Sequence, residues 1–421
     1  MELKRVVITG IGAITPVGKT ASESWSNIKA GVSGAAPITL FDTSLFKTKF
    51  ACEVKDFKAE EHFDRKEARK IDRYAQFAIV AAREAVADSG MNLDDVDKDD
   101  IGVILGVGIG GLYSFAYDVK EFGVSGATMG PRFSPFFIPK TIADMASGLI
   151  SIEFGFRGPN YATTAACASA SNALIDAFNL IRLGKAKAIL AGGAEAPITD
   201  AGVGGFNAMH ALSTLNDDPE HASRPFSASR DGFVLGEGAG ILMLEDLEHA
   251  KARGAKIYAE IVGGGLSADA YHMTASHPDG LGAVLVMKRA LNDAEVKPED
   301  VDYINVHGTS THVGDISEVK AIKEVFGEHA DKLNISSTKS MTGHLLGGAG
   351  AIEAVFTTLS VKDNVVPPTI NHDADDQDPE IDYNLNYTFN MAQEREINVA
   401  ISNTFGFGGH NACVVFKKYT E

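Results

Sequence analysis

The sequence predicts an α/β protein assembled from two similar halves, and three observations support this fold class. Apolar runs that end near glycine alternate with segments of helical spacing along the chain. Apolar residues make up 45% of the 421 residues, charged residues make up 22%, and there are 43 glycines, which is typical of folded α/β proteins. In addition, the order of predicted strands and helices in the first half recurs in the second.

The overall composition excludes several classes of function. A net charge of −18 repels nucleic acid and anionic membranes over most of the surface. No apolar run reaches the roughly 18 residues that cross a bilayer, and the N-terminus lacks a signal layout, so we expect a cytoplasmic protein. The cysteines, Cys52, Cys167 and Cys413, are too dispersed for a disulfide framework or a ligand cluster, so we predict no metal site.

The first predicted strand, residues 6–10, is expected to end in a glycine turn, with a helix over residues 22–28 after it. Gly10 and Gly12 begin a dinucleotide fingerprint, but Thr15 occupies the place of its third glycine. We therefore do not expect a nucleotide site in this turn.

Two further segments of the first half stand out by composition. Residues 65–82 are predicted to form one long amphipathic helix, which begins with the densest basic cluster, Lys66, Arg69 and Lys70. Such a run is usually a solvated helix face. The aromatic and proline-rich residues 129–139 indicate a lid or a subunit contact rather than a regular element.

Cys167 lies among small residues, between a predicted strand over residues 161–164 and a helix that continues through residues 173–178. At the first turn of a helix, unpaired N–H groups and the dipole favour an anion, so we expect the pKa of this thiol to be lowered. Cys167 is thus a candidate nucleophile. The alternative is a small buried hydrophobe, which describes most free cysteines.

The layout of the first half recurs after a boundary near residue 256, which predicts halves over residues 1–256 and 257–421. The strands expected at 258–262, 301–306, 333–337 and 398–401 correspond to those at 6–10, 101–105, 161–164 and 188–190. Such a repeat predicts a doubled sheet with pseudo-twofold symmetry. Ligands bind at strand ends in open α/β sheets, so the matching ends are expected to meet at the site.

Those strand ends hold Cys167, His307, Lys339, His344 and the glycine-lined Phe407 loop. A Cys/His pair alone permits a thioester hydrolase. Two histidines with a lysine and no evident acidic orienter indicate another use, in which neutral imidazole N–H groups stabilise an enolate; removing such a donor costs about 3 kcal/mol. The backbone N–H groups of Phe407 and Cys167 are candidates for a second oxyanion hole.

Four motifs occur in order along the chain: Thr164-Ala-Ala-Cys167-Ala-Ser-Ala, His307-Gly-Thr-Ser-Thr-His-Val-Gly-Asp315, Lys339-Ser-Met-Thr-Gly-His344 and Gly406-Phe-Gly-Gly409-His-Asn411. They resemble the motifs of the β-ketoacyl-acyl carrier protein synthases, and among these the type II synthases. The resemblance implies a thiolase-like fold, with two pseudo-symmetric halves in five layers (α-β-α-β-α), and a homodimer that needs no cofactor. It also implies fatty acyl elongation by decarboxylative condensation of carrier-bound acyl and malonyl groups.

The resemblance also implies a role for each site residue. Cys167 takes the acyl group, while His307 and His344 hold the malonyl thioester oxygen as carbon dioxide leaves. Supporting roles fall to Lys339 (electrostatics), Glu353 (supporting shell), Phe407 (gate over Cys167), Thr309 and Thr311 (hydrogen bonds to the pantetheine arm) and Ile109 (border of the acyl pocket).

Docking of an acidic carrier protein is expected at Lys66, Arg69 and Lys70, because an acidic enzyme must offer it a positive patch. His210 stands where family members often carry arginine, which weakens the expected anion patch near the entrance. Alternatives are a hydrolase, a thiolase-type acyltransferase with a second cysteine as base, and a non-catalytic partner subunit. Cys413 lies in an apolar run and is predicted to be core, and the presence of Cys167 argues against the partner subunit.

Overall fold

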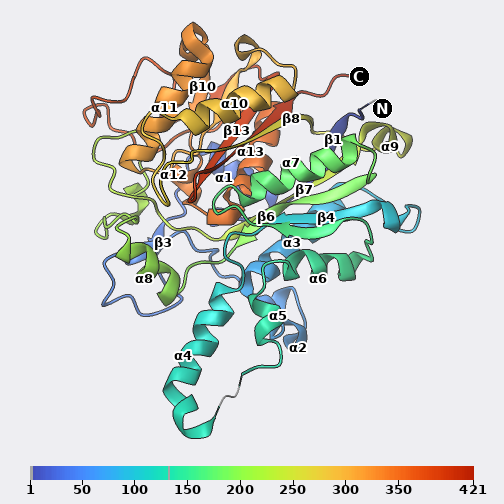
Figure 1. Ribbon diagram of the computed structural model, residues 1–421, viewed down its shortest axis with the longest axis vertical. Helices are drawn as coiled ribbons and strands as arrows, with labels where there is room; N and C mark the ends of the chain where they lie inside the picture. The colour runs from blue at the N-terminus through green and yellow to red at the C-terminus, as the bar shows by residue number, and fades with distance from the viewer. Residues whose placement is uncertain (1–2, 131–132) are drawn as a thin grey trace.

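The computed structural model describes residues 3–130 and 133–421, and its main sheet has ten strands in these residues (Figure 1). The first half of the chain supplies β1 (Val6–Ile14), β4 (Ile101–Gly106), β5 (Asn160–Thr163), β6 (Ala188–Glu195) and β7 (Gly238–Asp246). The second half supplies β8 (Ala259–Ala268), β9 (Tyr303–Asn305), β10 (Asn334–Ser336), β13 (Val399–Gly406) and β14 (His410–Lys417). The order across the sheet is β10-β9-β13-β14-β8-β1-β7-β6-β4-β5.

The two halves of this sheet have the same topology. Read outward from the β1-β8 contact, the first half runs β1-β7-β6-β4-β5 and the second runs β8-β14-β13-β9-β10. β4 is parallel to both β5 and β6, as β9 is to both β10 and β13. β6 and β7 are antiparallel, as are β13 and β14. The repeat predicted from the sequence is therefore confirmed strand by strand.

Helices separate and cover the two sheet halves to give five layers (Figure 1). In the central layer, α7 (Ser169–Arg182) and α13 (Ala349–Asp363) each contact strands of both halves. α3 (Arg73–Asp88) and α6 (Met145–Phe154) cover the first half, while α10 (Leu281–Asp293) and α11 (His312–Phe326) cover the second. α13 is buried from residue 349 to residue 361, as a helix packed on both faces must be.

The glycines of β1 do not form the expected turn, and the strand continues through them to Ile14. A Cβ on Gly10 would lie 2.2 Å from the carbonyl oxygen of Ala85 in α3, and one on Gly12 would lie 2.0 Å from that of Ala81. These glycines therefore allow close packing of a helix on a strand. Gly265 of β8 has the same role, because its Cβ would lie 2.3 Å from the carbonyl oxygen of Val286 in α10.

The long helix predicted over residues 65–82 is wrong, because two helices occupy this segment. α2 (Arg65–Ala68) ends before Asp72, whose side chain accepts a hydrogen bond from the Tyr74 N–H and so caps α3. The helix predicted over residues 22–28 is confirmed as α1 (Ala21–Lys29). The remaining α-helices are α4 (Leu112–Met129), α5 (Phe137–Thr141), α8 (Asp200–Ala208), α9 (Leu247–Ala252) and α12 (Lys339–Thr342).

α4 projects from the layered body, and α5 returns beside it (Figure 1). Phe133 packs on Phe122 and Phe137, with ring centroids 5.3 and 4.8 Å apart. The end of the aromatic segment belongs to helix α5, where the sequence predicted irregular structure. Residues 131–132 of that segment lie outside the described residues. In the described part of the chain, none of the helices has the length and apolar character to span a bilayer.

Candidate active site

Cys167 lies in the turn between β5 and α7, at the centre of the molecule. The preceding Ala166 adopts a positive φ of 47°, and α7 begins two residues after Cys167, at Ser169. The start of α7 lies so close to β4 that a Cβ on Gly106 would be 2.1 Å from the Ala170 nitrogen. A glycine is therefore required in β4 where α7 begins, and the buried thiol faces a cavity.

Two histidines of the second half lie next to the thiol. His344 follows α12, and its Nε2 is 3.0 Å from the Cys167 Sγ. His307 follows β9, and its ring is perpendicular to that of His344, with centroids 5.2 Å apart. The edge of Phe233 packs on His344 at 5.3 Å and so helps to fix its orientation. The repeated fold thus brings Cys167 and both histidines together.

The pKa of the Cys167 thiol is shifted in the opposite direction from the one predicted from the sequence. Burial raises the pKa of Cys167 to about 12. The positive charge of Lys339 and the backbone N–H groups of Phe407 and Cys167 act in the opposite direction without overcoming burial. The predicted lowering by the helix terminus is therefore wrong, because residues distant in the sequence bury the sulfur, most of them from the first half, among them Ile198, Leu212 and Phe233. Cys167 is a neutral thiol at rest and needs a proton acceptor to react.

Both histidines are neutral near pH 7. Burial lowers the pKa of His307 and of His344 well below the ordinary value, and the charge of Lys339 lowers each further. Lys339 itself is buried and forms an ion pair with Glu353 of α13. A neutral imidazole can accept a proton at one nitrogen and donate an N–H from the other, which suits the enolate chemistry considered above.

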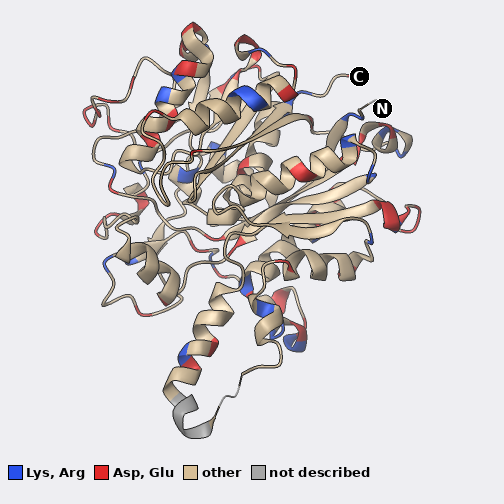
Figure 2. Cartoon of the chain, in the orientation of Figure 1, with Lys and Arg blue, Asp and Glu red and all other residues tan. Residues whose placement is uncertain are grey.

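A cavity of about 570 Å³ joins these groups. Among its lining residues are Cys167, His307, His344, Thr309, Thr311, Ile109, Phe407 and His210. Lys339 and Glu353 lie behind the histidines, outside the lining. Lys66, Arg69 and Lys70 lie outside the lining as well, on and just after α2, and the Lys70 ammonium lies 5.7 Å from the ring centroid of Phe136. Figure 2 shows basic residues gathered near the base of the projecting helices. Lys70 forms an ion pair with Glu67, which reduces the local positive charge.

An acidic group that the sequence analysis missed supports His307. The Glu318 carboxylate in α11 accepts hydrogen bonds from the backbone N–H groups of His307 (2.9 Å) and Gly308 (2.8 Å). Burial raises the pKa of Glu318 to about 7. The sequence signal for this role was the position of Glu318 on the helix that follows His307. The carboxylate orients the histidine through the backbone N–H and not through the ring.

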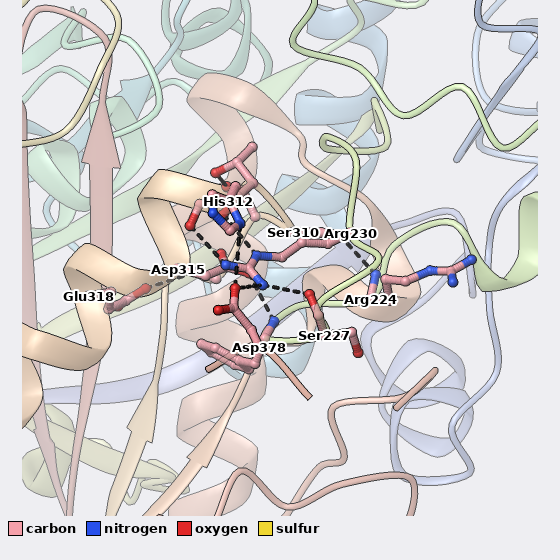
Figure 3. A network of polar contacts seen from close by, with 12 residues as sticks. Arg224, Ser227, Arg230, Ser310, His312, Asp315, Glu318 and Asp378 are labelled. Carbon is pink, nitrogen blue, oxygen red and sulfur yellow. Dashed lines mark hydrogen bonds and ion pairs between the residues drawn. The ribbon is translucent and has the colours of Figure 1, made fainter. Parts of the chain in front are cut away.

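A buried arginine supports the neighbouring wall of the cavity (Figure 3). Arg230 forms ion pairs with Asp315 (3.3 Å) and Asp378 (2.8 Å). It also donates hydrogen bonds to the carbonyl oxygens of Thr311 (3.2 Å) and His312 (2.9 Å), both of which line the cavity. The network fixes the backbone of the segment that carries Thr309 and Thr311.

Comparisons with known proteins place the chain in one family. Residues 3–250 match the model of the beta-ketoacyl synthase N-terminal domain, and residues 258–373 match that of the C-terminal domain. A Staphylococcus aureus protein named 3-oxoacyl-[acyl-carrier-protein] synthase 2 is 53% identical over 417 residues, which cover 99% of each chain. A Synechocystis protein of the same name is 51% identical over 420 residues, covering 100% of this chain and 99% of the relative.

Solved structures agree with this assignment. A beta-ketoacyl synthase from Burkholderia phymatum superimposes with a TM-score of 0.90 at 35% identity, covering 99% of this chain and 100% of that one. A chain from a type II PKS acyl-carrier protein in complex with its ketosynthase gives the same TM-score at 34% identity, with the same coverage. The fold and the cavity are those of a condensing enzyme. The chain belongs to the beta-ketoacyl synthase family.

Proposed function

We propose that this chain is an acyltransferase that elongates fatty acyl chains by condensing an acyl group with malonyl-acyl carrier protein to give 3-oxoacyl-acyl carrier protein. The observation that carries the proposal is the contact of the Cys167 sulfur with His344, beside a second neutral histidine, in one cavity. Relatives that are half identical over their whole length and named for this reaction support it.

The first step transfers the acyl group to Cys167. His344 Nε2 accepts the thiol proton as the sulfur attacks the thioester carbonyl, and the proton then passes to the departing carrier thiolate. The backbone N–H groups of Cys167 and Phe407, which lie near the sulfur, stabilise the oxyanion that forms. The products are an acyl-enzyme thioester and a free carrier thiol.

The second step is decarboxylation and carbon–carbon bond formation. For this step His344 adopts the tautomer with its proton on Nε2, the nitrogen that faces the sulfur. Neutral His307 and His344 then donate N–H groups to the malonyl thioester oxygen, and the negative charge that develops as carbon dioxide leaves is held there. The carbanion attacks the acyl carbonyl on Cys167 and expels the thiolate, which takes up one proton from solvent, so that each condensation consumes one proton. The low histidine pKa values support this role, because the imidazoles stay neutral donors at physiological pH.

The partners that we propose are acyl carrier protein and a second copy of the chain, in the cytoplasm. Lys66, Arg69 and Lys70 offer the carrier a positive surface. A homodimer would cover β5, which ends the sheet order and exposes Tyr161, and the projecting helix, on which Tyr117 is 62% exposed.

Product analysis tests the proposal. The chain is incubated with acyl- and malonyl-acyl carrier protein, and we expect 3-oxoacyl thioester and carbon dioxide in equal amounts. Release of free fatty acid without condensation would support a thioester hydrolase instead. A thiolase-type acyltransferase would condense two acyl thioesters without releasing carbon dioxide.

A further inference from the structure

Glu195 is a fully buried carboxylate at the end of β6, and the mechanism above does not use it. Its oxygens accept hydrogen bonds from four backbone N–H groups, those of Gly108 (2.8 Å), Ile109 (3.2 Å), Gly110 (3.1 Å) and Gly347 (3.1 Å). Burial raises the pKa of Glu195 to about 7, and the four donors oppose that shift. The four donors come from two separate segments of the chain.

These two segments are parts of the cavity wall. Residues 108–110 follow β4, and the Ile109 side chain lines the cavity. Gly347 belongs to the 3₁₀ turn just after His344. The two backbones are in such close contact that a Cβ on Gly347 would lie 2.1 Å from the Gly108 nitrogen. The Glu195 carboxylate therefore joins the Ile109 loop to the segment that follows a site histidine.

We propose that Glu195 is a positioning residue, which holds Ile109 at the wall of the acyl pocket and so sets the preference for acyl chain length. The inference rests on the proposed condensing function. It assigns Glu195 no contact with the substrate, because the carboxylate acts through the backbones of residues 108–110 and of Gly347.

A carboxylate is the group that this position requires. Its two oxygens have enough lone pairs for four N–H donors, whereas the glutamine amide has one oxygen and places an NH₂ group against the remaining donors. Gly110 has a φ of 86°, so the loop also depends on a conformation that side chains disfavour. Replacing Glu195 by glutamine should release the loop, and Ile109 could then move aside for longer chains.

The test is the chain-length profile of Glu195→Gln, with kcat and KM measured for acyl-carrier substrates from short to long at saturating malonyl carrier. We expect the ratio of kcat/KM for long chains to that for short chains to rise about tenfold, the lower end of the change that one methylene makes in a hydrophobic pocket. The KM for malonyl carrier should stay unchanged. A merely structural role would lower activity equally for every chain length.

Two further variants control for stability. Glu84→Gln is the matched control, because the Glu84 carboxylate also accepts backbone N–H groups, those of Ala13 (2.8 Å) and Ala21 (2.9 Å), away from the cavity. It should leave the chain-length ratio unchanged. Gly110→Ala strains the loop without altering the carboxylate, and it should shift the ratio in the same direction as Glu195→Gln.

A folded Glu195→Gln protein with a ratio within about twofold of the unmodified chain overturns the inference. If that variant does not fold, Gly110→Ala decides. A rise in its ratio of kcat/KM for long to short chains supports the inference, and an unchanged ratio overturns it. An unmodified chain that never condenses acyl and malonyl groups overturns the proposed function, and this inference with it. A chain that condenses normally but shows no shift in either variant overturns this inference alone.

Discussion

The two strand-to-helix connections that enter the central layer have the same place in the repeat but different content. In the first half, residues 164–168 join β5 to α7 and contain Cys167. In the second half, the longer segment 337–348 joins β10 to α13 and contains Lys339 and His344. In the proposed mechanism, the short turn of small residues supplies the sulfur that holds the acyl group, while the longer segment supplies proton transfer and charge. On this proposal the repeated scaffold places the sulfur and the groups that act on it in different halves.

The largest effect should come from the first half. Cys167→Ala removes the sulfur that accepts the acyl group, so condensation should fall by about 1,000-fold or more. Acyl-enzyme formation, measured by mass spectrometry of the intact protein, should be absent. Circular dichroism and thermal unfolding should match the unmodified chain, because the side chain that is lost is small. Acylation at another residue would contradict the assignment.

Mutation should distinguish the roles of the two histidines. Alanine at either position removes a donor to the malonyl oxygen and should lower decarboxylation by about 100- to 1,000-fold. Of the two histidines, His344 is the one with a hydrogen bond to the sulfur in the described structure, so His344→Ala should also slow acylation of Cys167 whereas His307→Ala should not. Single-turnover acylation measures this split, and equal slowing in both variants would remove the distinction between them.

Matching glycine-to-alanine substitutions should destabilise the two halves to a similar extent, even though the chemistry of the halves differs. Gly12→Ala and Gly265→Ala each place a Cβ within 2.3 Å of a helix carbonyl, so each should lower the free energy of unfolding by about 2 kcal/mol. Gly148→Ala is the control, because no atom lies within 4 Å of its added Cβ. Denaturant unfolding measures the three variants. A large loss in one half only would show that the packing is not equivalent.

The reactivity of Cys167 should depend on pH over a wide range. Burial raises its pKa to about 12, so the thiolate fraction should increase about tenfold per pH unit through neutrality. Alkylation by a small reagent should therefore accelerate steadily from pH 6 to 9. A plateau near pH 7 would restore the lowered pKa that the sequence predicted. Cys52 and Cys413 are buried and do not line the cavity, so they should react slowly.

The smallest effect should come from the surface of the first half. Reversing the charges of Lys66, Arg69 and Lys70 should raise KM for carrier-bound substrate several-fold and leave a small thioester unaffected. The effect should shrink at high salt, since exposed charges are screened. Equal changes for both substrates would show that these residues do not dock the carrier.

The sequence was sufficient for the repeat and for the residues that meet at its centre, because strand periodicity and unusual residue types mark the ends of β5, β9 and β13. The core assignment of Cys413 is also confirmed, since the residue is fully buried in β14. Glycines in β1 were mistaken for a turn, because the helix that packs on them is distant in the sequence. The direction of the Cys167 pKa shift was wrong for the same reason, because most of the apolar residues that bury the thiol, such as Ile38, Val203 and Phe233, are distant from it in the sequence.

Carboxylates that act on the backbone were the least visible feature. Glu195 and Glu318 each accept N–H groups of glycine-containing loops from other elements. These contacts depend on tertiary structure, and apart from the place of Glu318 on the helix after His307, local patterns do not indicate them. Asp72 is different, because its bond to the Tyr74 N–H is local, and an aspartate before an apolar helical run is a start signal that periodicity alone overlooks.

The division of labour between the halves is tested most directly by carbon dioxide release from malonyl-acyl carrier protein in the Cys167→Ala and His307→Ala variants. We predict that Cys167→Ala still releases carbon dioxide although it cannot condense. His307→Ala should become acylated on Cys167 but release carbon dioxide at least about 100-fold more slowly. Loss of carbon dioxide release in Cys167→Ala, with the fold intact, would contradict the account.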